Sequence, residues 1–167
     1  MSARCATFFP TKPTWPRIAV IGGGRYVVTA DEGDTRTGDG SNGPRGGRTV
    51  TVLDLVTDKT YDTGSALDDL AASIGLYPDR RSDRGGSEPE VLVATSYQGR
   101  ELVAVGLERA NAVVVIDVSD PTEPTPLGIA KTGANPEGVE FVQFGNRLYV
   151  LAANEVSGTV TAVAVHL

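Results

Sequence analysis

The chain has 167 residues, of which 40% are apolar, so it is long enough for one domain with its own hydrophobic core. Its net charge of −6 at pH 7 argues against nucleic acid or an anionic membrane surface as a partner. The single cysteine, Cys5, excludes an internal disulfide and a cysteine-based zinc site, and no apolar run has the roughly 18 residues of a membrane-spanning helix.

The N-terminal segment, residues 1–16, is expected to be irregular. It lacks the continuous apolar stretch of a secretion signal, so the sequence shows no export signal of its own. A cytoplasmic protein and a piece of a longer exported protein both fit this feature.

Residues 17–62 predict a first antiparallel unit of four strands. β-Branched residues are concentrated in short runs, and three consecutive glycines lie between the first two of them. A polar, glycine-rich stretch at residues 34–47 follows the second run and predicts a loop. The expected strands are residues 17–21, 26–30, 48–55 and 59–62.

Residues 63–88 predict an insertion that consists of a helix and a loop. Apolar residues recur at helical spacing over residues 65–75, where Ser65 is a suitable N-cap and Gly75 a suitable end. The charged residues 78–87 that follow predict a surface loop.

The remainder of the chain is an internal repeat with a constant offset of 47 residues. Residues 89–131 and 135–167 are the two copies, and Tyr26–Glu32 matches Tyr149–Glu155 as part of a third copy. The identical pairs are Pro89/Pro136, Glu90/Glu137, Arg100/Arg147, Glu108/Glu155, Val113/Val160 and Val118/Val165. The expected strands are residues 91–94, 101–105, 112–118, 125–130, 139–143, 147–153 and 159–165.

Strands, tight turns and a fixed period together predict an all-β fold. Four strands in every roughly 40–50 residues are typical of a β-propeller blade of the YVTN or WD40 kind, and each such unit needs a neighbour to bury its apolar face. The sequence therefore predicts a partial propeller of about three four-stranded antiparallel blades with one short inserted helix. Propellers close with about four to eight blades, so we expect a second copy of the chain, or blades outside this sequence, to complete the ring.

Acidic residues recur at the open end of each predicted hairpin. Glu90 and Glu108 lie symmetrically about one turn, and Glu137 and Glu155 lie symmetrically about the next. Like charges that face each other across strands need compensation. The candidate site residues are Asp31, Glu32, Asp34, Glu90, Glu108, Glu137 and Glu155.

Two interpretations of these acids remain open. Carboxylate oxygens are ligands for a divalent cation, calcium or magnesium. Alternatively, each glutamate accepts backbone N–H bonds from the turn of the next blade, or pairs with Arg36 or Arg109. No catalytic residue and no cofactor-binding motif is predicted, since the only histidine is His166 beside the C-terminus and the glycines at residues 22–24 lack the spacing of a dinucleotide fingerprint.

Four segments resemble one known family, the choice-of-anchor I propellers, also described as mesenchyme-specific cell-surface glycoprotein-like. They are Thr29–Arg36, Gly106–Arg109, Asn135–Gly138 and Ala153–Val160. The resemblance implies a seven-bladed propeller that is exported and anchored at the cell surface, of which this chain matches the C-terminal blades only. Val91 and Asp31 depart from the family, which usually has glycine and asparagine at these positions.

The predicted function is a non-catalytic propeller module of an exported or surface protein that binds a partner or ligand through one face. Members of the family are frequently labelled alkaline phosphatase-like. The alternative function is therefore a metal-dependent phosphoesterase that uses the acidic residues as metal ligands. The sequence does not identify the partner or the ligand.

Overall fold

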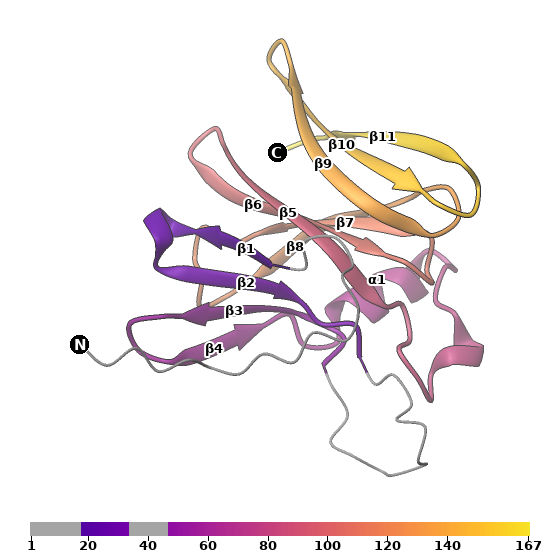
Figure 1. Ribbon diagram of the computed structural model, residues 1–167, viewed down its shortest axis with the longest axis horizontal. Coiled ribbons are helices and arrows are strands. Elements are labelled where there is room, and N and C mark those ends of the chain that lie inside the picture. The colour runs from indigo at the N-terminus through magenta and orange to yellow at the C-terminus, as the bar shows by residue number, and fades with distance from the viewer. Residues whose placement is uncertain (1–17, 34–46) are drawn as a thin grey trace.

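The computed structural model describes residues 18–33 and 47–167, which form a succession of antiparallel β-sheets with a helix at one side (Figure 1). The first sheet has the strand order β1-β2-β3-β4. Its strands are β1 (Ile18–Ile21), β2 (Tyr26–Ala30), β3 (Val50–Asp54) and β4 (Lys59–Asp62), with the 3-10 turn η1 (Gly22–Gly24) after β1.

The middle sheet has the order β5-β6-β7-β8, and the last sheet has the order β11-β10-β9. The middle strands are β5 (Pro89–Tyr97), β6 (Arg100–Leu107), β7 (Ala112–Asp117) and β8 (Thr125–Lys131). The last strands are β9 (Pro136–Phe144), β10 (Arg147–Asn154) and β11 (Thr159–Val165). In the sequence, α1 (Ala66–Ser73) and the 3-10 turn η2 (Asp79–Arg81) lie between β4 and β5.

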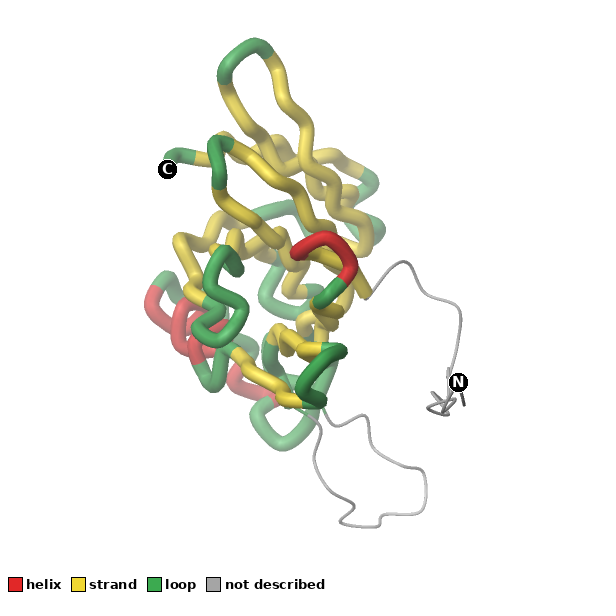
Figure 2. The backbone as a smooth tube through the Cα atoms, turned by 90° about the vertical axis from the view of Figure 1, so that its left-hand side faces the viewer, coloured by secondary structure: helices red, strands yellow, loops and turns green. Residues whose placement is uncertain are grey.

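The fold is all-β and propeller-like, as the sequence predicts. Figure 2 shows the same succession of sheets from the side. Two sheets have the predicted four strands, but the last sheet has three within the described residues. Among the described residues, no helix combines the length and hydrophobicity needed to span a membrane.

Strand pairing reproduces the internal repeat. Tyr97 pairs with Arg100 at the hairpin of the middle sheet, and the residues 47 positions later, Phe144 and Arg147, pair in the last sheet. The turn that joins β5 to β6 has positive φ at Gln98 (51°) and Gly99 (78°), as a type I′ hairpin turn requires. The period read from the sequence is therefore a period in backbone pairing.

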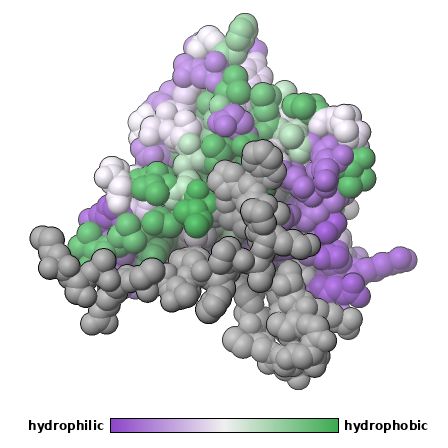
Figure 3. All heavy atoms as spheres, in the orientation of Figure 1, coloured by the Kyte–Doolittle hydropathy of each residue, from purple (hydrophilic) through white to green (hydrophobic). Residues whose placement is uncertain are grey.

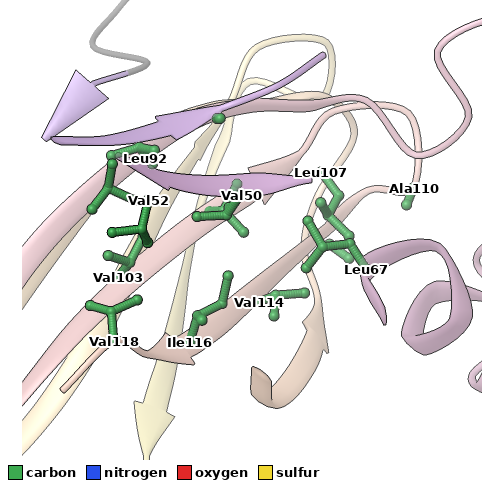
Figure 4. Packing of buried hydrophobic residues seen from close by; sticks show 14 of the residues in the cluster. Val50, Val52, Leu67, Leu92, Val103, Leu107, Ala110, Val114, Ile116 and Val118 are labelled. Atoms are coloured by element: carbon green, nitrogen blue, oxygen red, sulfur yellow. The ribbon is translucent and has the colours of Figure 1, made fainter. Parts of the chain in front are cut away.

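The main core lies between the first and middle sheets (Figure 4). Val50 and Val52 of β3 are fully buried in one cluster with Val114 and Ile116 of β7. Leu67 of α1 belongs to the same cluster, so the inserted helix closes one end of the core.

A second core lies between the middle and last sheets. Ala104, Val113 and Val115 of the middle sheet are buried with Val150 of β10, and Val139 is packed against them. Each face of the middle sheet is thus covered by a neighbouring sheet. This arrangement is the stacking that repeat units require, because one unit alone cannot bury both of its apolar faces.

The charged segment at residues 78–87 is exposed only in part, so the prediction of a surface loop is wrong for its end. Gly85, Gly86 and Ser87 are buried. The Arg48 guanidinium donates from Nη2 to the carbonyl oxygens of Ser82 (2.7 Å) and Arg84 (2.5 Å). These contacts fold the segment back onto the first sheet, which charge content alone does not predict.

Candidate functional site

The β5–β6 hairpin of the middle sheet and the β9–β10 hairpin of the last sheet each contain a β-bulge at the end away from the turn. In both hairpins the extra residue of the bulge is a glutamate. The register of β5 shifts between Pro89 and Val91, so Glu90 is the extra residue of the bulge. The register of β9 against β10 shifts beside Asn154, where Glu137 is the extra residue. A bulge bends the strand locally and redirects a side chain, and here it does so at the same position of both repeats.

Each bulge glutamate meets a second glutamate just past the next strand. Glu108 follows β6 and lies close enough to Glu90 for Glu90 to raise its pKa. Glu155 follows β10 and in the same way raises the pKa of Glu137. The structure thus brings together four of the candidate site residues in two pairs, with the partners that the hairpin symmetry predicts.

A residue with left-handed backbone conformation precedes each bulge. Glu88 has φ of 53° and Asn135 has φ of 55°. Their carbonyl oxygens accept the backbone N–H of Glu108 (2.9 Å) and of Glu155 (2.8 Å), respectively. Asparagine is enriched in this conformation, whereas a glutamate there needs support from its surroundings.

The two glutamate pairs are linked through the entry of the last sheet. The Asn135 side-chain amide donates to Glu108 Oε1 at 2.8 Å, and the Asn135 backbone N–H donates to Asn111 Oδ1 at 2.9 Å. Close packing accompanies these bonds, since a Cβ on Gly106 would lie 3.0 Å from the Pro136 carbonyl oxygen. Glu108 therefore accepts a side-chain N–H from the next sheet, whereas the second interpretation of the acids predicts a backbone N–H.

Two arginines hold a buried carboxylate at this junction. The Arg109 Nε–H donates to Glu88 Oε2 at 2.7 Å, and Arg109 Nη1 lies 2.9 Å from Glu108 Oε1. Arg81 pairs with the other oxygen of Glu88, whose side chain is 4% exposed. The pairing with Arg109 was predicted for the glutamates in general, whereas Arg36 lies outside the described residues.

Glu88 is the residue that the sequence analysis missed. Its position in the repeat was the available signal, because it aligns with Asn135 at the offset of 47. A charged residue in place of the expected asparagine marks an exception that demands a counter-charge.

The local electrostatics raise the pKa of one glutamate in each pair. Burial, the hydrogen bond that protonated Glu108 donates to Glu90, and the charges of Glu90 and Glu88 raise the pKa of Glu108 to about 8, and Arg109 opposes this rise. Burial and Glu155 raise the pKa of Glu137 as well, with a further contribution from Glu90. The influence of Glu90 on Glu137 shows that the two pairs are electrostatic neighbours, so their protonation is a property of the group.

The acids of the first sheet have different surroundings. Asp31 accepts hydroxyl hydrogen bonds from Thr29 (2.9 Å), Thr49 (2.7 Å) and Thr51 (2.5 Å). Its carboxylate thus anchors β3 to the end of β2. Glu32 is half-buried beside it, and Asp34 lies outside the described residues.

The three threonine hydroxyls around Asp31 have a counterpart in the repeat. Asn154 is the counterpart of Asp31 in the last sheet, and its side-chain amide donates to the hydroxyls of Thr159 (3.1 Å) and Thr161 (3.0 Å). The direction of the hydrogen bonds is therefore reversed, because a carboxylate only accepts while an amide nitrogen only donates. The departure of Asp31 from the family pattern is compensated within its own sheet.

A cavity of about 590 Å³ opens on the far face of the last sheet, next to the second glutamate pair. It is lined by Glu137, Gly138, Ala153, Asn154, Glu155, Gly158, Thr159 and Val160. In the described part of the chain, no group of three or more His, Cys, Asp or Glu side chains is arranged to hold a metal ion. The divalent cation and the phosphoesterase alternative remain predictions.

Comparison with known proteins gives one match. No curated protein and no solved structure matches the chain. Residues 43–121 match the family model of the choice-of-anchor I domain, a segment that contains β3 to β7, α1, Glu88 and the first glutamate pair. The match confirms the resemblance that the sequence motifs indicated: over residues 43–121, the chain is similar to choice-of-anchor I domains.

Proposed function

We propose that this chain is a non-catalytic propeller module of an exported or surface-associated protein, and that it binds a partner chain through the far face of its last sheet. The observation that supports the proposal is the exposure of Val160. This side chain is 68% exposed, whereas its counterpart in the middle sheet, Val113, is 1% exposed. Val113 is buried by the last sheet, so the matching face of the last sheet is available to a further sheet.

The far face of the last sheet has the composition of a sheet-packing surface. Residues directly opposite each other in an antiparallel pair share one face, which assigns the side chains from the strand registers. This face carries Val142, Phe144, Tyr149, Leu151, Ala153, Val160, Ala162 and Ala164, together with Gly138 and the charged residues Glu140 and Arg147. Over the last sheet at the top of the molecule, hydrophobic side chains lie among hydrophilic ones (Figure 3). A stacked neighbour would cover this apolar surface and gain the hydrophobic free energy that the middle sheet already gains.

The rim of the cavity offers a polar contact of known form. At the existing junction, Glu108 accepts the side-chain amide of Asn135 at the entry of the next sheet. Glu155 occupies the corresponding position at the open face and lines the cavity. A partner that enters with an amide donor would therefore find the same acceptor.

Self-association tests this face, since a second copy of the chain is the partner at hand. The substitution Val160→Glu is expected to abolish concentration-dependent association measured by light scattering, because a charge would have to be buried in the contact. Val56→Glu is the matched control: Val56 is also exposed (73%) but lies in the turn between β3 and β4. A wild-type chain that stays monomeric at all concentrations, with normal stability, would contradict binding by this face.

A calcium titration tests the predicted cation. Glutamates bind a cation in their ionised form, which is favoured above the raised pKa of Glu108. If the two pairs form a site, calcium at about 1 mM should raise the melting temperature more at about pH 9 than at about pH 6. Glu137→Gln should remove the effect. Equal melting temperatures with calcium and with a chelator at both pH values would refute a calcium site.

A further inference from the structure

We propose that the outer edge of β11 and the cavity beside it accept an extended strand from a partner polypeptide. This surface differs from the face around Val160, so the inference goes beyond the proposed function. Within the described residues, β11 pairs with β10 and ends the last sheet. In the first and middle sheets, a fourth strand, β4 or β8, occupies the corresponding place.

The repeat identifies which backbone edge is open. β11 (Thr159–Val165) lies 47 residues after Ala112–Val118, and it pairs with β10 in the same register in which β7 pairs with β6. The other edge of β7 pairs with β8 along its length, from Ala112 opposite Lys131 to Asp117 opposite Thr125. The matching edge of β11 therefore has the geometry to receive a strand, and such edges recognise extended peptides through main-chain hydrogen bonds.

A cavity of about 280 Å³ lies beside this edge. Val163 and Val165 line it from β11, Val113 and Val115 from β7, and further residues from β8. The same four valines belong to the core between the middle and last sheets, so the cavity is an open extension of an established interface. Only His166 among the lining residues carries an ionisable side chain.

The third strand is less buried in the last sheet, which has no fourth strand among the described residues, than in the middle sheet, which has one. Val163 and Val165 are half-buried. Their counterparts in the middle sheet, Ile116 and Val118, are 0% and 1% exposed. Ile129 of β8 packs against the cluster that contains Ile116 and Val118. A matching aliphatic side chain on an added strand would fill the cavity beside Val163 and Val165.

These observations define the chemistry of the occupant. It is an extended, mostly uncharged strand that runs antiparallel to β11 and places an aliphatic side chain at every second position, because alternate residues of a strand share one face. Thr125–Lys131 of β8 is the example of such a strand that this protein itself contains. Every described strand already has a place in a sheet, so none of these strands is the occupant.

Hydrogen exchange of the whole chain tests the proposal. A synthetic peptide with the sequence of Thr125–Lys131 is the probe, and it is expected to slow exchange of the β11 amides in a saturable manner. A control peptide with aspartate in place of Leu127 and Ile129 should leave these amides unchanged. In the chain, Val163→Glu should abolish the protection, whereas Val160→Glu, on the opposite face of the same strand, should retain it. The second variant separates this site from the self-association face.

Three outcomes would overturn the proposal. They are a lack of protection by the probe, protection that survives Val163→Glu, and β11 amides that are protected in the chain alone but become exposed when residues 1–16 are deleted. The last outcome would assign the edge to the chain itself. If Val163→Glu does not fold, Val165→Thr keeps the side-chain shape, adds a hydroxyl to the cavity, and should weaken peptide binding by about tenfold. Unchanged binding by Val165→Thr would also count against the cavity.

Discussion

Replacing Arg109 with methionine is expected to lower the free energy of unfolding by about 2–3 kcal/mol, the upper part of the range for losing a hydrogen bond to a charged group. Arg109 contacts two carboxylates at once, Glu88 at 2.7 Å and Glu108 at 2.9 Å. Both carboxylates are nearly buried, with side-chain exposures of 4% and 7%. Urea unfolding at constant pH measures the change, with the slope in urea as the check on two-state behaviour.

Two further variants show whether the loss comes from burial of charge. Arg100→Met removes an ion pair with Asp117 of similar length, 2.9 Å, but with the arginine 46% exposed, and should cost less than about 1 kcal/mol. Glu88→Asn combined with Arg109→Met should recover most of the loss. That substitution removes the buried charge and installs the residue that the next repeat uses at the same left-handed position, Asn135. Equal costs for the two arginine variants, or no recovery in the double variant, would contradict this account.

The architecture could be predicted from the sequence because the repeated residues occupy equivalent positions in the paired strands. Alternation of apolar residues and glycine-containing turns gave the strands, and the offset of 47 gave the register of one hairpin from the other. The meeting of Glu90 with Glu108, and of Glu137 with Glu155, follows from the symmetry of each hairpin. What the pattern could not give is the close approach of the two carboxyl groups in each pair, because that depends on the bulges that redirect Glu90 and Glu137.

The role of the other acids depends on contacts that no sequence period encodes. Asp31 was a candidate metal ligand, but Thr49 and Thr51 lie 18 and 20 residues away from it in the sequence. Glu88 directly follows the segment 78–87 that was predicted to be a surface loop, and it is buried because Arg81 and Arg109 neutralise it from two sides. In both places, a long-range polar contact overrides the local composition.

The free energy of unfolding is expected to fall by about 2 kcal/mol as the pH rises from about 6 to about 9. Folding raises the pKa of Glu108 from 4.5 to about 8. Between pH 4.5 and pH 8, therefore, the folded chain keeps a proton on Glu108 that the unfolded chain has already lost. The stabilisation from this proton is complete below about pH 4.5 and is lost as the pH rises through about 8. Urea unfolding curves over the pH series give the slope directly.

Glu108→Gln should flatten this dependence without breaking the junction between the sheets. Glutamine keeps an oxygen that can accept the Asn135 amide, and its own amide can donate toward Glu90 as the protonated carboxyl does. Glu123→Gln is the matched control, since Glu123 is exposed on the loop before β8 and should leave the slope unchanged. A decline that persists in Glu108→Gln would mean that this carboxyl does not hold the proton.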